Sequence, residues 1–359
     1  MSAQVIWDRG VSISGHRLWL DPLVVRTFAF ISHAHTDHAR RHKEALLTPQ
    51  TLALIPEARR PRGWRMLGYD EPMRLGPATV TLHSAGHMLG SAQLLFEHQG
   101  TRVLYTGDIK LRQPGGGPPT QVPKAHVLVL ESTYGRPHFR FGDPDTTVEA
   151  IARWCRLAID SRVTPVLLCH ALGKTEEIML ALSAYGFKFA LEKRCVPCAQ
   201  AYAMAGRPLP DWVELDGEVE PGRVVIAPPA GKDEVRRLGR YRTALVSGWA
   251  KDAEFSRIFG ADATFDLSDH CDFDELLDYL AEKIPIAKVK RTRGRITDLT
   301  VDARGRKCRA YINKKEALEL EPPVHLTAWV DLLLNRLSDA AATDADLRRA
   351  YLRSGWALR

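Results

Sequence analysis

The segment that most constrains the fold lies between residues 32 and 38 and reads Ser-His-Ala-His-Thr-Asp-His. It directly follows a predicted strand. In an extended chain, alternate residues point to the same side, so His33 and His35 can converge on one point while Asp37 and His38 turn toward a second. Imidazoles and carboxylates are ligands that zinc and similar metals take. Because so much polarity is costly at a strand end, the segment predicts a metal site.

Three later segments place further ligand-type residues after predicted strands. His87 stands in the glycine-flanked turn Gly-His-Met-Leu-Gly-Ser-Ala, Asp108 ends Tyr-Thr-Gly-Asp, and Glu131 opens Glu-Ser-Thr-Tyr-Gly. Each alone is more simply an ordinary turn residue. Together with the first cluster they form a candidate ligand set on loops at one sheet edge, where functional sites usually lie.

The pattern of apolar and polar residues changes at about residue 143. The first 135 residues alternate apolar and polar side chains in short runs, which predicts half-buried strands separated by Gly, Pro and Asp turns. Beyond that point helices and strands alternate, beginning with an apolar helical spacing over Thr146–Asp160 and a strand over Pro165–Cys169. Such alternation is typical of an α/β layer with parallel strands. Two short amphipathic helices are expected after Leu326.

The net charge is concentrated in one stretch of the sequence. The chain has 50 Lys and Arg against 43 Asp and Glu, a formal charge of +7. Between Lys288 and Ala310 there are nine basic and two acidic residues, so the remainder holds 41 of each sign. This segment is either a solvated basic loop or a surface for a polyanion such as nucleic acid.

Composition excludes several classes of protein. No apolar run approaches the roughly 18–20 residues of a membrane helix, so no membrane partner is expected. The first ten residues contain no apolar stretch of the signal-peptide type. Six cysteines in 359 residues do not make a disulfide framework, which predicts a reducing, cytoplasmic location.

The motifs resemble those of a known family in order and spacing. His-Ala-His-Thr-Asp-His, then Gly-His-Met-Leu-Gly-Ser-Ala, then Thr-Gly-Asp resemble the metallo-β-lactamase fold, and Leu-Trp-Leu-Asp-Pro at 18–22 resembles its leading Asp motif. Glu-Ser-Thr-Tyr-Gly at 131–135 and Ser-Asp-His at 268–270 resemble the β-CASP nuclease branch. Phrases such as Ala-Gly-His-Met-Leu-Gly-Ser-Ala-Gln and Ala-Leu-Gly-Lys-Thr-Glu-Glu most resemble bacterial ligase-associated DNA exonucleases, which are relatives of Artemis-type nucleases.

The resemblance covers about residues 5–310 and implies a fold. We expect an α/β protein, a metallo-β-lactamase αββα sandwich with an inserted α/β β-CASP domain that covers the metal cleft. Residues 1–142 would form the first part of the core and 143–240 the insert. Residues 241–315 would return to the core, and 316–359 would form a helical tail.

The same resemblance implies roles for the candidate residues. His33, His35 and His87 would bind a first metal ion, Asp37 and His38 would face a second, and Asp108 would bridge them. Asp21 would orient the cluster through its ligands. Glu131 and His270 would stand at the catalytic edge, with His270 as a general acid or phosphate contact. The ions would be one or two zinc, with manganese as an alternative, and a metal-bound hydroxide steered by Asp37 would attack phosphorus.

One position departs from the family pattern. A Thr-His-Gly motif with a further ligand is expected where residues 292–294 read Thr-Arg-Gly. A guanidinium cannot ligate a metal, so either the second metal is weak or absent, or Arg293 contacts a substrate phosphate. Arg291 and Arg295 beside it would belong to the same phosphate-binding rim. Both activity and loss of activity stay open at this point.

Two weaker motifs have competing interpretations. Gly173-Lys174-Thr175 ends like a phosphate-binding loop, but Leu168 replaces the required first glycine, which argues against a Walker site. Lys174 then either meets a nucleic-acid phosphate or simply starts a helix. Cys195 and Cys198 form a lone Cys-x-x-Cys without a second pair, so local packing is favoured over a metal or redox role.

These observations favour a metal-dependent phosphodiesterase acting on DNA, exonuclease-like, in DNA repair or end processing, with an ATP-dependent DNA ligase as a candidate partner. A first alternative is an RNA-processing nuclease of the same branch, because both kinds of enzyme contact mainly backbone phosphates. A second alternative, suggested by Arg293, is a catalytically weak nucleic-acid-binding relative.

Overall fold

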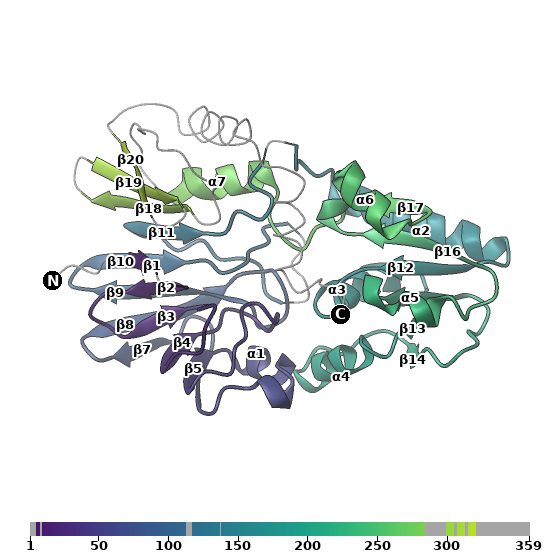
Figure 1. The fold of residues 1–359 in the computed structure, drawn as a ribbon, viewed down its shortest axis with the longest axis horizontal. Coiled ribbons are helices and arrows are strands. Elements are labelled where there is room, and N and C mark those ends of the chain that lie inside the picture. The colour runs from purple at the N-terminus through teal and green to yellow at the C-terminus, as the bar shows by residue number, and fades with distance from the viewer. Residues whose placement is uncertain are drawn as a thin grey trace. The chain divides into compact units, whose positions relative to one another are not determined.

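The structure is a computed structural model that describes residues 5–7, 9–112, 117–136, 138–283, 299–304, 307–312 and 315–320. The chain divides into two compact units (Figure 1). The first comprises the described residues within 1–111, 117–140 and 270–320. The second comprises residues 141–269, with Arg112. In sequence, the second unit therefore interrupts the first.

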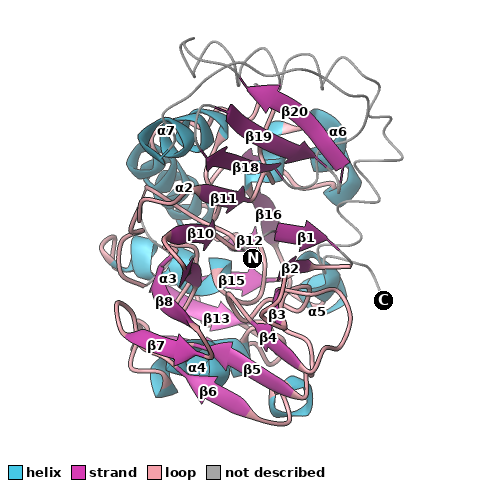
Figure 2. Cartoon of the chain, turned by 90° about the vertical axis from the view of Figure 1, so that its left-hand side faces the viewer, coloured by secondary structure: helices cyan, strands magenta, loops and turns pink. Residues whose placement is uncertain are grey.

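The first unit contains two sheets (Figure 2). One has the strand order β1 (Val5–Trp7), β2 (Val11–Ile13), β3 (Leu18–Leu20), β4 (Phe28–Phe30), β5 (Glu44–Leu47), β6 (Trp64–Met66). The other has the order β20 (Lys315–Leu320), β19 (Lys307–Ile312), β18 (Leu299–Arg304), β11 (Val127–Leu130), β10 (Thr101–Tyr105), β9 (Ala92–His98), β8 (Ala78–Ser84), β7 (Pro72–Leu75). The described helices of the first unit are α1 (Pro49–Leu54) and α7 (Phe273–Lys283), and a 3-10 turn lies at Glu57–Arg59.

Both sheets contribute to one buried cluster. Phe30 and Leu46 from the first sheet lie in the same core as Val80 and Phe96 from the second, and all four are fully buried. Burying such side chains is the main driving force that holds two sheets together. This agrees with the mixed α/β class that the sequence predicts. The complete four-layer arrangement with helices on both outer faces stays a prediction.

The second unit is built on a parallel sheet with the order β14 (Trp212–Glu214), β13 (Lys188–Leu191), β15 (Arg223–Ala227), β12 (Thr164–Leu168), β16 (Tyr241–Val246), β17 (Ala263–Phe265). Its helices are α2 (Pro144–Asp160), α3 (Lys174–Ser183), α4 (Val196–Met204), α5 (Lys232–Val235) and α6 (Ala253–Phe259), with 3-10 turns at Pro229–Gly231 and Gly248–Lys251. Asp143 caps α2 by accepting the Thr146 N–H, and Pro144 occupies its first turn, as helix starts prefer.

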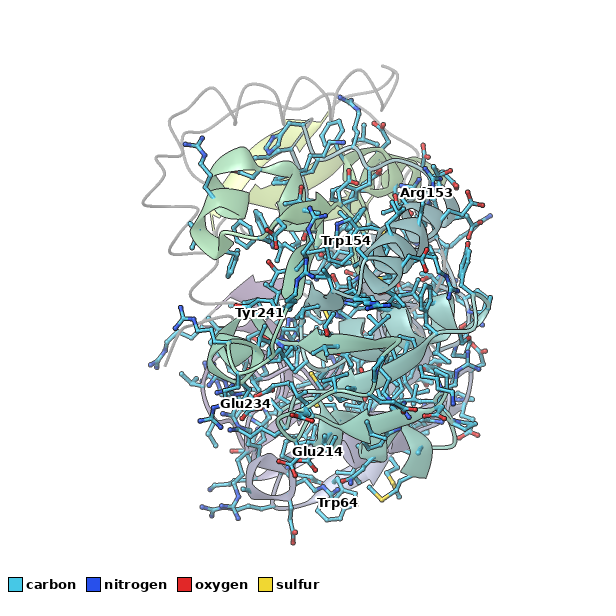
Figure 3. All side chains as sticks on the ribbon, turned by 90° about the vertical axis from the view of Figure 1, so that its right-hand side faces the viewer. Trp64, Arg153, Trp154, Glu214, Glu234 and Tyr241 are labelled. Atoms are coloured by element: carbon cyan, nitrogen blue, oxygen red, sulfur yellow. The ribbon has the colours of Figure 1, made fainter. Side chains whose placement is uncertain are left out.

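The end of the second unit lies later than the sequence predicted. Residues 241–269 were expected to return to the core, but β16 pairs in parallel with β12 from Tyr241 to Leu245, and β17 pairs with β16. Leu245 is fully buried, and Val246 and Ala244 lie in the hydrophobic core of this unit. The chain returns to the first unit only at His270. Figure 3 looks onto this unit, with Trp154 and Tyr241 labelled.

The predicted helical tail is wrong at its beginning. Residues 315–320 form β20, which pairs antiparallel with β19 in the second sheet of the first unit. The rest of the predicted tail lies outside the described residues. Among the residues that are described, no helix is both long and apolar enough to cross a membrane.

Candidate metal centre

The candidate residues follow strands whose ends meet at one place. Strand β4 is parallel to both β3 and β5, so the turn after β3, with Asp21, and the loop after β4, with His33, lie at the same sheet edge. In the second sheet β10 and β11 are parallel, which places Asp108 and Glu131 together. The Ala92 N–H donates to the Ser32 carbonyl at 2.8 Å and joins the two edges.

His87 lies in the turn between β8 and β9. This turn needs its glycines: Gly86 has φ 68° and Gly90 has φ 80°. A Cβ on Gly86 would lie 2.4 Å from the Lys110 carbonyl oxygen, closer than any real contact. Because β9 runs antiparallel to β10, the turn that starts β9 lies beside the end of β10 and therefore beside Asp108.

Three imidazole nitrogens face one another at the centre of the site. His33 Nε2 lies 3.1 Å from His35 Nδ1, which lies 3.2 Å from His87 Nε2. With an oxygen of Asp108, these ligand atoms all lie within 4.8 Å of one another. Nitrogens bound to a tetrahedral zinc at about 2.0–2.1 Å stand about 3.3 Å apart. The donor types and their spacing therefore fit a metal ion.

Asp108 occupies the middle of the wider cluster. Its Oδ2 lies 3.5 Å from His33 Nε2 and 3.4 Å from His38 Nε2. The same oxygen lies 4.0 Å from Nε2 of both His87 and His270. One carboxylate oxygen thus faces imidazoles on both sides, which is the placement that a bridging ligand requires. Asp37 stands farther out, with Oδ2 3.8 Å from His38 Nε2 and its side chain 30% exposed.

Asp21 holds the cluster in place through hydrogen bonds to its neighbours. Its carboxylate accepts hydrogen bonds from Ser32 N–H at 2.8 Å, His38 Nδ1 at 2.8 Å and the Tyr105 hydroxyl at 3.0 Å. The Ser32 hydroxyl also donates to it. Because Nδ1 of His38 is held in this way, its Nε2 faces Asp108, as metal-binding histidines commonly require.

Glu131 and His270 form a second supporting pair. His270 Nδ1 donates to Glu131 Oε2 at 2.8 Å, and the other oxygen of Glu131 accepts the Ile109 N–H at 2.6 Å. Thr133 Oγ1 also donates to Glu131, at 2.6 Å. His270 is held in place because the Cys271 N–H donates to the Ile109 carbonyl. Nε2 of His270 is consequently turned toward Asp108.

The electrostatics of the site favour a cation. Burial, together with the neighbouring imidazoles, lowers the pKa of His33 well below its ordinary value, which keeps it in the neutral form that binds metals. Burial raises the pKa of Asp108 to about 7, opposed by His38 and increased by Glu131. Burial alone would lower the pKa of His38, but Asp108, Asp21 and Asp37 raise it well above its ordinary value.

The remaining predicted site residues are Lys174, which belongs to the second unit, and three arginines. Lys174 starts α3 in the second unit, is only 2% exposed, and pairs with Glu177 at 2.7 Å and with Asp269 at 3.9 Å. A buried, neutralised ammonium is not available to a phosphate, so the helix-start interpretation is the one that fits. The three arginines proposed as a phosphate-binding rim, Arg291, Arg293 and Arg295, lie outside the described residues.

The Cys-x-x-Cys pair shows no sign of reactivity. Cys195 is fully buried at the start of α4, with its Sγ 3.5 Å from Thr175 Oγ1, and burial raises its pKa well above the ordinary value. Burial also raises the pKa of Cys198. Both thiols are free. Reactive thiols have lowered pKa values, so these observations agree with a packing role.

Several supporting residues escaped the sequence reasoning. Ser32 and Tyr105 both donate to Asp21, and Thr133 donates to Glu131. Each of them stands inside or beside a quoted motif. Their positions were therefore visible, but a hydroxyl reveals its partner only once the strands are paired.

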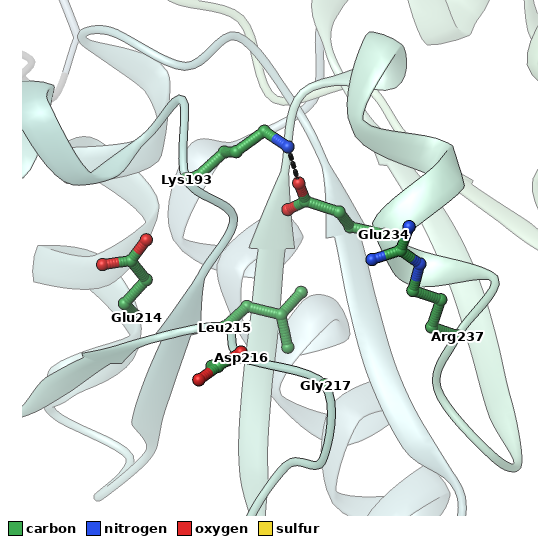
Figure 4. A pocket seen from close by; sticks show the side chains of 7 residues that line it. All are labelled: Lys193, Glu214, Leu215, Asp216, Gly217, Glu234 and Arg237. Atoms are coloured by element: carbon green, nitrogen blue, oxygen red, sulfur yellow. Dashed lines mark ion pairs between the residues drawn. The ribbon is translucent and has the colours of Figure 1, made fainter.

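The second unit contains a separate cavity of about 200 Å³ at the ends of β13 and β14 (Figure 4). In it Lys193 pairs with Glu234, while Glu214 stands apart from both. Arg237 adds a second cation. Of the predicted site residues that the structure describes, none lines this cavity.

Comparisons with known proteins bear on the family. No protein-family model matches the chain. The chain is 35% identical over 327 residues to a probable DNA ligase of Opitutus terrae, a match that covers 89% of this chain. It is 29% identical over 156 residues to endoribonuclease YSH1 of Yarrowia lipolytica and 29% over 150 residues to ribonuclease TTHA0252 of Thermus thermophilus. The chain is homologous to β-CASP nucleases of the metallo-β-lactamase family.

The resemblance seen in the motifs is thereby confirmed at the level of the family. The β-CASP relatives match less of the chain than the ligase does, 38% for YSH1 and 40% for TTHA0252. The chain in turn spans about a third of the length of the ligase (32%) and of TTHA0252 (32%), and 18% of YSH1.

Proposed function

We propose that this chain is a metal-dependent nuclease that hydrolyses phosphodiester bonds in nucleic acid, with DNA as the preferred substrate. The observation that carries the proposal is the convergence of three imidazoles and one carboxylate, His33, His35, His87 and Asp108, within 4.8 Å. Homology to β-CASP nucleases supports a nuclease over other uses of such a centre. In this proposal residues 141–269 are the inserted β-CASP domain.

The proposed roles follow from the donor geometry. His33, His35, His87 and Asp108 would hold one ion, and Asp108, His38 and Asp37 would hold or face a second. A bound zinc or manganese ion would lower the pKa of water and offset charge on the phosphate oxygens. Asp37 is 30% exposed, so its carboxylate can orient the attacking water and accept its proton.

His270 would serve the leaving group. Its Nδ1 donates to Glu131, which fixes the ring and leaves Nε2 on the side of Asp108. A protonated Nε2 in this position can donate to the leaving oxygen or to a phosphate oxygen. Glu131 acts by positioning His270, because both of its oxygens already accept hydrogen bonds from within the protein.

Two substrates compete in this proposal. The match to a probable DNA ligase over 89% of the chain supports DNA, and it supports end processing next to ligation, with a DNA ligase as partner. The ribonuclease relatives support RNA processing as the second candidate. Exonuclease action, DNA repair and residence in a reducing cytoplasm stay predictions from the sequence.

Digestion of matched substrates tests the proposal. The full chain, loaded with zinc or with manganese, is incubated with 5′-labelled DNA and RNA oligonucleotides of the same sequence, beside Asp37→Ala and Asp70→Asn variants. Asp70 pairs with His83, is not one of the predicted site residues, and serves as the control. We expect metal-dependent cleavage of DNA that Asp37→Ala loses and Asp70→Asn keeps.

The other outcomes separate the alternatives. Preferential cleavage of RNA would replace the DNA assignment by the RNA-processing one. A protein that holds metal and binds oligonucleotides, yet cleaves nothing beyond what Asp37→Ala cleaves, would be the weakly catalytic binding relative that Arg293 suggested.

A further inference from the structure

A dense group of basic side chains lies outside the metal centre, in the first unit. Residues 40–65 hold seven basic and two acidic residues, a local charge of +5. Acidic residues elsewhere cancel this excess in the overall sum, so it is invisible when the chain is counted as a whole. We name this group, together with Trp64, the basic edge: Arg40, Arg41, Lys43, Arg59, Arg60, Arg62, Trp64 and Arg65.

Backbone hydrogen bonds bring the two halves of the basic edge together. The Arg62 N–H donates to the His42 carbonyl and the Gly63 N–H to the Lys43 carbonyl, both at 2.9 Å. Strand β6, which carries Trp64, then pairs with β5 and is the outermost strand of its sheet. Arg40 and Arg41 extend the group toward the metal centre, since they follow His38 by two and three residues.

The side chains of the basic edge are largely exposed to solvent. Six of the seven basic residues are exposed, and the seventh, Arg60, is half-buried. Within the described part of the chain, only Arg65 forms an ion pair, with Glu44 at 2.7 Å. Trp64 is 46% exposed and stands on the outermost strand of its sheet. A large exposed aromatic ring among unneutralised cations is unusual for a surface without a partner.

We propose that the basic edge binds a single-stranded polynucleotide, with the guanidinium and ammonium groups on its phosphates and the Trp64 indole stacked on an unpaired base. Arginine and lysine beside an exposed aromatic ring are the two components of single-strand binding. A strand held there reaches the metal centre through Arg41 and Arg40. This step rests on the proposed function, whereas binding itself does not.

Affinity as a function of salt separates the two contributions. Fluorescence anisotropy is measured with the full chain and labelled phosphorothioate oligonucleotides, which resist hydrolysis, as single-stranded DNA and as RNA. Removing two phosphate contacts, Arg59→Ala with Arg62→Ala, is expected to lower the slope of log affinity against log salt by about 1.4. Trp64→Ala is expected to weaken binding about tenfold while leaving that slope unchanged.

Matched variants give the controls. Trp64→Phe keeps an aromatic face and should retain most of the affinity. Arg153 and Arg207 are exposed arginines of the second unit, so Arg153→Ala with Arg207→Ala removes the same charge elsewhere. Met204, 78% exposed, gives Met204→Ala as the control for losing an exposed apolar side chain. Neither the Arg153/Arg207 pair nor Met204→Ala should change the affinity or the salt slope.

Three outcomes would overturn the inference. One is a Trp64→Ala protein that binds DNA and RNA oligonucleotides as the wild type does. Another is an equal effect of the Arg59/Arg62 and the Arg153/Arg207 pairs on the salt slope. A third is a change of oligomeric state in Trp64→Ala without loss of affinity, which would make the edge a protein-docking surface. Loss in the DNA arm alone, or in the RNA arm alone, would identify the natural strand.

The test stands apart from that of the proposed function. Cleavage by the wild type is read on unmodified oligonucleotides, and binding on the resistant ones. Binding without cleavage would leave this inference in place and remove the nuclease.

Discussion

His38 and Asp21, seventeen residues apart in the chain, are joined by a hydrogen bond of 2.8 Å from Nδ1 to Oδ2. The same carboxylate also accepts from Ser32 and Tyr105, so one buried group fixes the ring of a candidate ligand and the strand that leads to it. Asp21 is only 7% exposed and adopts a left-handed φ of 40°. A backbone held in this region reflects a surrounding structure that determines it strongly.

Replacement of Asp21 should therefore weaken metal binding without removing a ligand. In Asp21→Asn, the amide cannot accept all the hydrogen bonds that the carboxylate accepts, so His38 loses its fixed orientation. We expect metal affinity to fall about ten- to a hundredfold. Competition with a chromogenic chelator measures this. Tyr105→Phe removes a single donor and should have a smaller effect; equal affinity in Asp21→Asn and wild type would contradict the anchoring role.

Asp108 should be the most sensitive carboxylate of the site, because its Oδ2 lies within 4.0 Å of four imidazoles. Asp108→Asn is expected to lower the cleavage rate about a hundredfold or more. Bound metal, measured by mass spectrometry, should fall with it. Asp70→Asn breaks a His–Asp pair of 2.7 Å elsewhere and controls for a general effect. Similar losses in both variants would argue against a special place for Asp108.

Gly107, directly before Asp108, should not tolerate a side chain. Its φ is 55°, and an added Cβ would lie 2.5 Å from the Ser32 Cβ. Gly107→Ala should cost about 1–3 kcal/mol of unfolding free energy from backbone strain, with the clash in addition. Urea unfolding measures the difference. Gly142→Ala, where nothing lies within 4 Å, is the control, and indistinguishable midpoints for the two variants would refute this expectation.

Glu176 should make stability depend on pH. It is fully buried in α3, and burial raises its pKa from 4.5 to about 8. A carboxyl whose pKa is raised in the folded state stabilises the protein fully below pH 4.5. That contribution is lost as the pH rises through about 8, by about 4–5 kcal/mol in total.

Glu176→Gln should abolish this component, because the amide stays neutral at every pH. Urea unfolding at pH 5 and pH 8 should show wild type losing more stability than the variant between the two. Glu57→Gln changes an exposed carboxylate and should follow the wild type. A parallel pH response of wild type and Glu176→Gln would show that this carboxyl ionises normally.

The candidate ligand residues could be predicted from the sequence more readily than the sheet to which each neighbouring strand belongs. His33, His87 and Asp108 could be singled out because ligand-type residues after strands share a sheet edge. Which sheet a strand joins, in contrast, depends on strand pairing, and the periodicity of its apolar residues does not show it. Residues 241–246 have the apolar pattern of a buried strand, and that pattern is the same whether the neighbour is β12 or a strand of the first unit.

For Lys174, the local sequence pattern predicts the secondary structure but not the burial of the side chain. Its neighbours in sequence predict a helix start, and that is what they form. One ion-pair partner, Glu177, is close in sequence, but the other, Asp269, lies 95 positions later, so the local sequence alone could not show that the ammonium would be buried. Burial of a charge depends on such distant partners, whereas helix starts depend on adjacent residues.

The bond between Glu131 and His270 has a consequence for the order in which the protein is made. These partners are 139 positions apart, and almost the whole second unit is synthesised between them. At roughly 5–20 residues per second, translation separates them by about 7–28 seconds. During that interval the nascent chain already carries His33, His87 and Asp108 while Glu131 has no His270 to hold. The centre is thus completed late in synthesis, after the intervening unit has emerged.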